Sequence, residues 1–369
     1  MLSGKLKDKL RKREQEGLLR TLPKLADGVD FVSNDYLGLA RLEAPISERS
    51  SQMGSTGSRL LSGNLHEYTT LESEIAGFHK SEAALVFPSG YMANLAVMSC
   101  FAQRGDTILY DQYMHASIRD GIRLSNANAH SFRHNDVQDL ETKLKKAEGD
   151  VYVVTESVFS MSGQQAPLTA ITELCGINKA RLIVDEAHAL GVIGPNGEGL
   201  CQKLQIENQV FARVFTYGKA LGVHGAAVVS SAEVIEYLIN FARPFIYTTA
   251  LPPLTLNHIA ANYNRLKTTN LVSQLGAVIL YFKNKLTELK LTEYFIESDT
   301  AIQSLPLEGV ENLTRVTDSL IQKGFNVLPI RYPTVQKGEE LIRISLHLFN
   351  TETEINDFLL ELKNCIDEN

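Results

Sequence analysis

The sequence predicts an α/β protein whose main sheet is mostly parallel, and three observations lead to that fold class. From about residue 83, short apolar runs rich in β-branched residues alternate with longer segments that have helical spacing. The apolar runs are almost continuous, which is typical of strands covered by helices on both faces. After about residue 253 the pattern changes to long amphipathic stretches, and a second, smaller α/β unit follows.

Six segments predict the strands of the main sheet, in the order 83–88, 106–111, 150–157, 180–188, 209–219 and 225–231. Each combines Val, Ile, Leu, Phe or Ala in a run of strand length. Between them, the segments 92–103 and 167–178 have the spacing and length of helices. Strands that alternate with helices in this way predict βαβ units.

The change of pattern along the chain predicts a division into three parts. Residues 1–50 are expected to form an N-terminal arm, 51–252 a large domain, and 253–369 an interdomain helix with a C-terminal small domain. Within the small domain we expect strands at 324–332 and 341–346 and a closing helix at 353–366.

Composition narrows the class of protein. With 369 residues and 44% hydrophobic composition the chain can bury a large core, and its net charge of -7 argues against nucleic acid as a partner. The four cysteines, widely spaced, predict reduced thiols and no zinc site. No signal-peptide core or membrane-length apolar stretch is found, so we expect a cytoplasmic protein without a membrane partner. The basic stretch 5–14 is typical of a solvated helix face and is compatible with an acidic partner.

Polar side chains follow the predicted strands where each strand ends, which is where open α/β sheets bind ligands. Asp185 and His188 follow one strand, and Thr216 and Lys219 follow the next. A lysine held among apolar groups loses hydration, so its pKa falls and its amine becomes nucleophilic. The alternative is that Lys219 is simply the exposed first residue of a loop. Ser160 and His115 follow two other strands in the same way.

Ser89, Gly90 and Tyr91 form a turn between a predicted strand and a predicted helix. Backbone N–H groups at such a helix start bind phosphate. The tetrapeptide DEAH at 185–188 also occurs in helicase nucleotide sites, but these need G-x-x-x-x-G-K-[ST], which this sequence lacks. A lysine, a carboxylate and a phosphate site together favour pyridoxal phosphate (PLP), whose aldehyde a lysine holds and whose ring nitrogen a carboxylate keeps protonated.

An ordered set of motifs carries a family resemblance along nearly the whole chain. They are FVSNDYLGLA (31–40), GSTGSRLLSGNLHEYTTLE (54–72), FPSGYMANLAV, HASI, HNDV, TESVFSMSGQQAPL, VDEAHALGVIG, TYGKALGVHGAAV, RPFIYTTALPP and RISLHLFNTETEI. In these motifs the sequence resembles the α-oxoamine synthases of the fold-type-I PLP-dependent transferases. Among them it is most similar to the 8-amino-7-oxononanoate synthases of biotin biosynthesis.

The resemblance implies a role for each matching residue. Lys219 would hold the cofactor, Asp185 would pair with its ring nitrogen, and His115 would stack on the ring. His188 and Ser160 would lie near the phenolic oxygen. The phosphate of the cofactor would be bound by Ser89, Gly90, Tyr91 and Thr216, together with Thr248 and Thr249 of a second subunit. Asn34 and Arg343 would bind the carboxylate of the amino acid, and Arg20 would lie on the side of the acyl substrate.

The resemblance also implies the reaction and the assembly. A homodimer with shared active sites would condense an L-amino acid with an acyl thioester of coenzyme A or acyl carrier protein and release carbon dioxide. L-Alanine and a pimeloyl thioester are the favoured pair. The alternatives within the family are enzymes that use glycine or serine, namely 2-amino-3-ketobutyrate ligase, 5-aminolevulinate synthase and serine palmitoyltransferase. A further alternative is a non-catalytic binding or assembly protein of the same fold. Two departures from the family pattern are a short 41–53 segment and Glu186 in place of an Asp.

Overall fold

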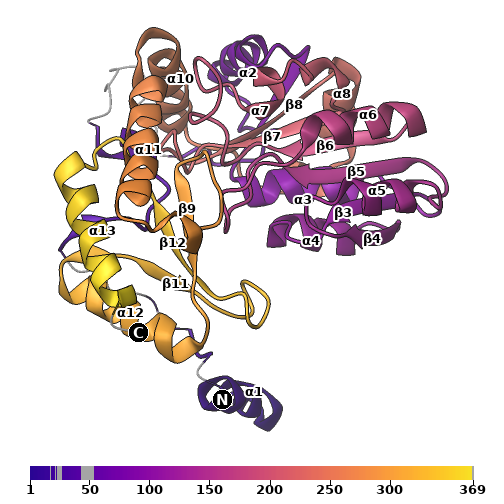
Figure 1. Ribbon diagram of the computed structural model, residues 1–369. Coiled ribbons are helices and arrows are strands. Elements are labelled where there is room, and N and C mark those ends of the chain that lie inside the picture. Colours follow the sequence, from indigo (N-terminus) through magenta and orange to yellow (C-terminus); the bar gives the residue numbers. More distant parts are fainter. Residues whose placement is uncertain (17, 21, 23–26, 43–53, 368–369) are drawn as a thin grey trace.

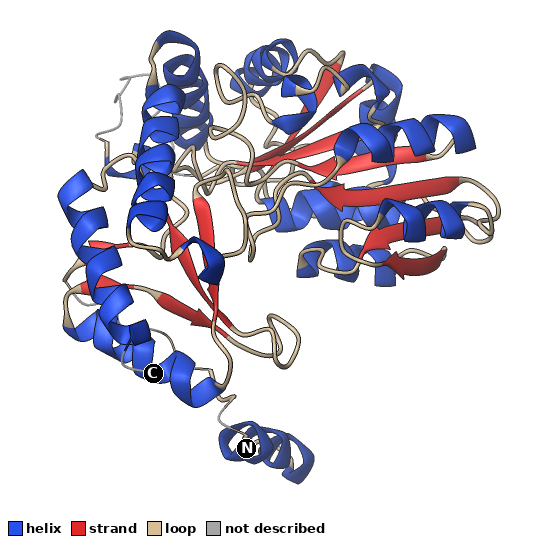
Figure 2. Ribbon diagram, viewed as in Figure 1, coloured by secondary structure: helices blue, strands red, loops and turns tan. Residues whose placement is uncertain are grey.

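The computed structural model describes residues 1–16, 18–20, 22, 27–42 and 54–367. A seven-stranded sheet with helices around it occupies one end of the molecule, and a smaller sheet covered by α12 (Val310–Gln322) and α13 (Glu352–Asp367) lies toward the other (Figures 1 and 2). None of the helices in this described part of the chain is long and apolar enough to span a lipid bilayer.

The main sheet has the strand order β2-β8-β7-β6-β5-β3-β4. The strands are β2 (Ala83–Phe87), β3 (Thr107–Asp111), β4 (Asn128–Phe132), β5 (Val151–Glu156), β6 (Arg181–Asp185), β7 (Ala212–Thr216) and β8 (Ala226–Ser230). All neighbouring pairs are parallel except those made by β8, which runs antiparallel to both β2 and β7. The carboxyl ends of β5, β6 and β7 therefore lie side by side.

Helices cover both faces of this sheet. They are α2 (His66–Phe78), α3 (Gly90–Cys100), α4 (Ala116–Leu124), α5 (Val137–Leu144), α6 (Leu168–Asn178), α7 (Leu200–Lys203), α8 (Ala232–Phe241) and α9 (Arg243–Ile246). Alternate residues of β2 enter two different cores: Val86 packs in one with α2, α5 and α6, and Leu85 in the other with α3 and α8. Burial on both faces explains why the strand sequences are almost continuously apolar.

The smaller unit contains the antiparallel sheet β11-β12-β9. Its elements are β9 (Ile302–Pro306), α12 (Val310–Gln322), β10 (Phe325–Asn326), β11 (Leu328–Ile330), β12 (Leu341–Ser345) and α13 (Glu352–Asp367). The long helices α10 (Pro253–Thr268) and α11 (Leu271–Glu288) precede it, and α11 packs against α13. Short 3-10 turns lie at Leu39–Arg41, Glu207–Gln209 and Thr292–Tyr294.

Part of the N-terminal segment pairs with this smaller unit. Helix α1 (Gly4–Gln15) is exposed along its whole length, while β1 (Val29–Asp30) pairs in parallel with β10. The chain then crosses to the main sheet, where a Cβ on Gly222 (φ +61°) would collide with the backbone of Ala40. This close approach presses the N-terminal segment against the turn that follows Lys219.

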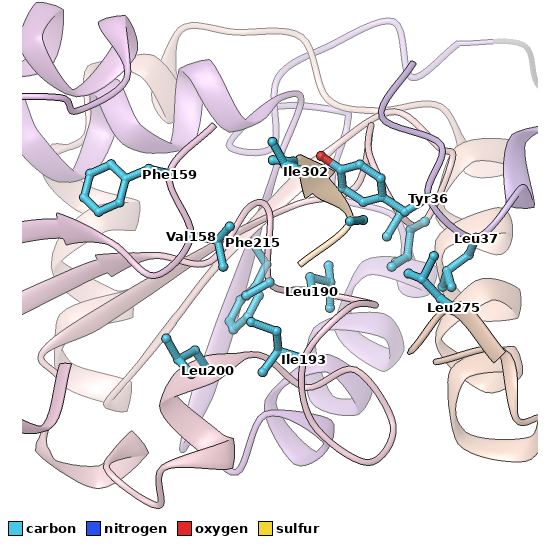
Figure 3. Close-up of a cluster of buried hydrophobic side chains, with 14 of the residues drawn as sticks. Tyr36, Leu37, Val158, Phe159, Leu190, Ile193, Leu200, Phe215, Leu275 and Ile302 are labelled. Atoms are coloured by element: carbon cyan, nitrogen blue, oxygen red, sulfur yellow. The ribbon is translucent and has the colours of Figure 1, made fainter. Parts of the chain in front are cut away.

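One hydrophobic core connects these parts of the chain. Figure 3 shows Tyr36 and Leu37 of the N-terminal segment with Leu190, with Leu275 of α11 and with Ile302 of β9, all buried in the same cluster. The N-terminal segment therefore packs against both sheet units.

All six predicted strands of the main sheet are confirmed, and so are the helices predicted at 92–103, 167–178 and 353–366 within a few residues. The single strand predicted at 324–332 is wrong, because it divides into β10 and β11, which pair with different strands. The domain limits at 50 and 252 stay predictions, and residue 50 and most of the short 41–53 segment lie outside the described residues.

Candidate active site

Three neighbouring strands place three polar residues at one edge of the main sheet. Glu156, Asp185 and Thr216 are the last residues of β5, β6 and β7. Glu156 and Asp185 are register partners in the parallel β5–β6 pair. Lys219 follows β7 by one tight turn, in which its carbonyl accepts a hydrogen bond from the Gly222 N–H at 2.8 Å. The side chains predicted from strand ends are thus brought to the same edge.

Asp185 is held in a fixed orientation. Its side chain is buried, Oδ2 accepts a hydrogen bond from Nδ2 of Asn94 at 2.7 Å, and Oδ1 accepts one from the Ala187 N–H at 2.9 Å. Asn94 belongs to α3, so a side chain of this helix holds the Asp185 carboxylate in place. A buried carboxylate held by two neutral donors can pair with a protonated ring nitrogen.

Lys219 is half-buried, and its pKa is lowered to about 8. The largest cause is removal of the ammonium from water, and the positive charge of Arg343 adds to it, while Asp185 and Glu156 act in the opposite direction. A lysine with this pKa is partly neutral near pH 8, so it is a competent nucleophile and base.

Glu156 is a member of the site that the sequence did not single out. Its carboxyl is buried, and Oε1 accepts a hydrogen bond from the His115 N–H at 2.6 Å. Burial, and next the charge of Asp185, raise the pKa of Glu156 to about 8, with Asp111 raising it further and Lys219 opposing. The signal that was available is its place at the end of an apolar strand, directly before Ser157.

His115 caps the start of α4. Its Nδ1 lies 2.7 Å from Oγ of Ser117, and the side chain is exposed. Ser117 in turn accepts a hydrogen bond from Asn94 at 3.1 Å. The imidazole and the Asp185 carboxylate are therefore positioned through the same asparagine.

His188 and Arg343 meet at the hydroxyl of Tyr36. Nδ1 of His188 lies 2.7 Å from this hydroxyl, and Nη2 of Arg343 donates to it at 3.2 Å. Arg343 also donates to Oδ1 of Asn34 at 2.8 Å and to the carbonyl oxygen of Ser160 at 2.6 Å. The predicted carboxylate-binding pair, Asn34 and Arg343, is thus assembled from opposite ends of the chain.

The predicted phosphate site lies where α3 begins against the end of β7. Oγ of Ser89 accepts a hydrogen bond from the Met92 N–H, which caps the helix. A Cβ on Gly90 would collide with Oγ1 of Thr216, so only glycine lets the helix start come this close to the strand. The side chain of Tyr91 turns outward and donates to Asp120. The backbone at this helix start is suited to an anion.

These residues fit PLP, which needs a lysine for its aldehyde, an acid for its ring nitrogen and donors for its phosphate. Lys219, Asp185 and the start of α3 supply all three around one edge of the sheet. The absence of a Cβ on Gly90 lets the start of α3 lie against Thr216, which keeps the helix-start N–H groups beside the end of β7.

Three predicted residues are not joined to this cluster. Thr248 and Thr249 lie on the loop before α10, which is held by the Ala250 N–H donating to the Gly57 carbonyl at 3.0 Å. Arg20 is exposed. Among the described residues, no hydrogen bond or ion pair links any of the three to the site around Lys219.

Known proteins match this chain over almost its whole length. The family model of class I and II aminotransferases matches residues 26–358. The 8-amino-7-oxononanoate synthase of Emericella nidulans is 37% identical, with 97% of this chain and 94% of that protein covered. The synthase of Lysinibacillus sphaericus is 36% identical, with 98% of both covered.

Solved structures of similar proteins also match this chain. The 8-amino-7-oxononanoate synthase of Francisella tularensis superposes with a TM-score of 0.78 at 31% identity, over 92% of this chain and 98% of that one. A serine palmitoyltransferase of S. paucimobilis with bound PLP gives a TM-score of 0.88 at 28% identity, over 99% and 97%. The chain therefore belongs to the class I and II aminotransferase family, as a fold-type-I PLP enzyme of the α-oxoamine synthase group that includes the 8-amino-7-oxononanoate synthases.

Proposed function

We propose that this protein catalyses the decarboxylative condensation of L-alanine with a pimeloyl thioester to give 8-amino-7-oxononanoate, a step of biotin biosynthesis. The observation that carries the proposal is Lys219, whose pKa is lowered to about 8, beside the buried carboxylate of Asp185. The relatives that cover nearly the whole chain are named for this reaction.

PLP, when bound, supplies a ring that accepts electrons from the α-carbon of the amino acid. Asp185 keeps the ring nitrogen protonated, and Nζ of Lys219 first holds the cofactor and then takes the proton from the α-carbon of the substrate. That carbon attacks the thioester carbonyl, and the thiol leaves. The carboxylate then departs as carbon dioxide, and Lys219 returns a proton to the α-carbon.

Histidine and arginine side chains orient the substrates. His115 would lie over the ring and donate a hydrogen bond to the oxygen that becomes negative at the thioester carbonyl, while His188 would lie near the phenolic oxygen of PLP. Arg343 and Asn34 bind the carboxylate of the amino acid. Because Arg343 is bonded to Asn34 and to the Ser160 carbonyl in this structure, substrate binding exchanges some of these contacts for the carboxylate.

The choice of L-alanine and a pimeloyl group rests on the named relatives. One observation favours a second candidate: serine palmitoyltransferases superpose with TM-scores up to 0.90, compared with 0.78 for the synthase of Francisella tularensis. Serine with a long acyl thioester, or glycine with a short one, would use the same catalytic residues. Either coenzyme A or acyl carrier protein can present the acyl group.

We further propose a cytoplasmic homodimer in which Thr248 and Thr249 of one subunit reach the phosphate of the other. Their place on a loop outside the Lys219 cluster supports this, since neither threonine is used within its own site among the described residues. A Ser89–Gly90 helix start and Thr216 supply the rest of the phosphate site.

The test is an assay of thiol and carbon dioxide release with L-alanine, glycine and L-serine, each paired with pimeloyl, acetyl and palmitoyl thioesters. Rapid release only with L-alanine and the pimeloyl thioester supports the proposal. A preference for serine and the palmitoyl thioester would replace it with the second candidate. Lack of a visible absorption band after reconstitution with PLP would instead indicate a non-catalytic protein of this fold.

A further inference from the structure

The hydroxyl of Tyr36 lies where three separate parts of the chain meet. Tyr36 belongs to the N-terminal segment, His188 follows β6 of the main sheet, and Arg343 lies on β12 of the smaller unit. The backbone of Tyr36 is fixed as well, because its carbonyl accepts a hydrogen bond from the Leu348 N–H at 2.8 Å. Figure 3 shows its ring packed beside Ile302 in the core. The hydroxyl therefore has little freedom to move.

A phenol has one proton, and two acceptors compete for this one. Oδ1 of Asn34 lies 3.0 Å from the Tyr36 oxygen, and Nδ1 of His188 lies 2.7 Å from it. Tyr36 is fully buried, and burial raises its pKa to about 12, so the hydroxyl stays protonated. Burial also lowers the pKa of His188 well below its usual value, so the imidazole is neutral and carries a single N–H.

Arg343 contacts both the hydroxyl and one of its two acceptors. Its Nη2 donates to the Tyr36 oxygen at 3.2 Å and to Oδ1 of Asn34 at 2.8 Å. A positive donor polarises the hydroxyl and strengthens the bond that the hydroxyl donates. Oδ1 of Asn34 can accept from both the guanidinium and the hydroxyl, but the contact to Nδ1 of His188 is shorter and a neutral imidazole nitrogen is a stronger base than an amide oxygen, so we infer that Nδ1 accepts the proton. The N–H of His188 then lies on Nε2, which has no hydrogen-bond partner among the described residues.

We propose that Tyr36 is a positioning residue that fixes the proton of His188 on Nε2 and links this proton to the occupancy of Arg343. The inference rests on the proposed function, in which His188 would lie near the phenolic oxygen of PLP. With the N–H on Nε2, His188 donates to that oxygen. When a substrate carboxylate binds Arg343, the donor to Tyr36 is withdrawn, so substrate binding is communicated to His188.

The first test observes the proton directly. The PLP-loaded enzyme is labelled with 15N-histidine, and the His188 signal is assigned by its loss in His188→Gln. The wild-type protein should show a protonated Nε2 and an unprotonated Nδ1, and Tyr36→Phe should show a mixture of both tautomers. A wild-type proton on Nδ1, or an identical tautomer ratio in Tyr36→Phe, would overturn the proposal. If Tyr36→Phe does not fold, the wild-type tautomer alone decides.

The second test separates positioning from stability. Tyr36→Phe should lower kcat about 10- to 100-fold, the loss seen when a partner that orients a metal-bound histidine is removed. It should also raise the KM for the amino acid and shift the pH titration of the visible cofactor band. The matched control is Tyr263→Phe, because Tyr263 is equally buried and its hydroxyl lies 2.9 Å from Nε2 of another buried histidine, His79.

Equal shifts of the cofactor band in Tyr36→Phe and Tyr263→Phe would assign the effect to lost stability and overturn the role of Tyr36. The proposed function fails in a different way, by the absence of condensation in the wild-type enzyme. The tautomer measurement needs no substrate, so the two failures are distinguishable.

Discussion

Glu156 and Asp185 occupy paired positions at the ends of two parallel strands, β5 and β6, and both carboxyl groups are buried. Two negative charges this close in a buried place repel each other, so one of them holds a proton. Asp185 accepts hydrogen bonds from Asn94 and Ala187, and the pKa of Glu156 is raised to about 8. The proton therefore belongs to Glu156 at neutral pH.

Glu156→Gln should reduce the pH dependence of stability. The folded-state pKa of Glu156, about 8, lies above its unfolded value of 4.5, so its stabilising contribution is present below pH 4.5 and is lost as pH rises through 8. Between pH 6 and 9, wild-type protein without cofactor should lose ~2.7 kcal/mol more than the variant, because about two pH units of differential titration contribute about 1.4 kcal/mol each. Urea unfolding at both pH values measures this. Equal losses would mean that Glu156 is ionised in the folded protein.

Lys219→Ala should remove both turnover and the visible band of the lysine-linked cofactor. Lys219 supplies the amine that holds the aldehyde and the base that moves the α-proton, so its loss leaves no substitute. Absorption spectra and the thiol-release assay measure the two effects. Lys203→Ala, at an exposed position at the end of α7, is the control and should behave as wild type. Turnover at the wild-type rate in Lys219→Ala would show that another residue holds the cofactor.

Asp185→Asn should keep the cofactor bound but slow proton removal from the α-carbon by at least about 100-fold, because a neutral amide cannot stabilise a charged ring nitrogen. The amide retains the size of the carboxylate and one acceptor for Asn94. Exchange of the α-proton of L-alanine for deuterium, followed by NMR, isolates this step. An unchanged exchange rate would exclude Asp185 from contact with the ring.

Gly90→Ala should weaken PLP binding about tenfold or more and destabilise the protein by about 1–3 kcal/mol, because the new Cβ collides with Thr216. The double variant Gly90→Ala/Thr216→Ala removes the contact with Oγ1 and leaves a milder one of 3.1 Å with the Cβ of residue 216, so it should recover most of the stability but not PLP affinity. Equilibrium dialysis with PLP and urea unfolding measure the two quantities. Normal PLP affinity in Gly90→Ala would place the phosphate elsewhere.

Mixed dimers test the shared site. A chain with Lys219→Ala is combined with a chain carrying Thr248→Ala and Thr249→Ala, after subunit exchange has been verified. Shared sites predict that activity reappears on mixing, because each mixed dimer then contains one site without a substitution. The cofactor should also stabilise the dimer, since it binds across the interface. Mixing without recovery would show that each site is built from a single chain.

The strands and the residues at their ends could be predicted from sequence because burial on both faces leaves a continuous apolar pattern. β4 was missed because it is an edge strand with the polar sequence NAHSF, whose residues are mostly exposed. β9 was missed because it carries Gln303 and Ser304, both buried and hydrogen-bonded to loop carbonyls. Sequences of this kind also occur in loops, so these two strands can be recognised only when the strands that pair with them are known.

The partners that orient the site could not be predicted in the same way. Asn94 lies inside a helix pattern, and Glu156 lies at the end of a strand, so each has an ordinary structural interpretation. Tyr36 fits the family motif, but its contacts with His188 and Arg343 depend on how distant segments pack. Spacing along the chain carries no information about such contacts.

The hydrogen bond between Asn34 and Arg343 joins residues that are 309 positions apart. At about 5–20 residues per second, a ribosome needs about 15 to 60 s to travel from one to the other. Throughout that interval the nascent chain contains Asn34, one member of the carboxylate-binding pair, but not Arg343. Asp185 and Lys219 are added before Arg343 as well. A premature stop before β12 would therefore release a chain with every segment of the seven-stranded sheet and the reactive lysine, but without the arginine that would bind the carboxylate of the amino acid.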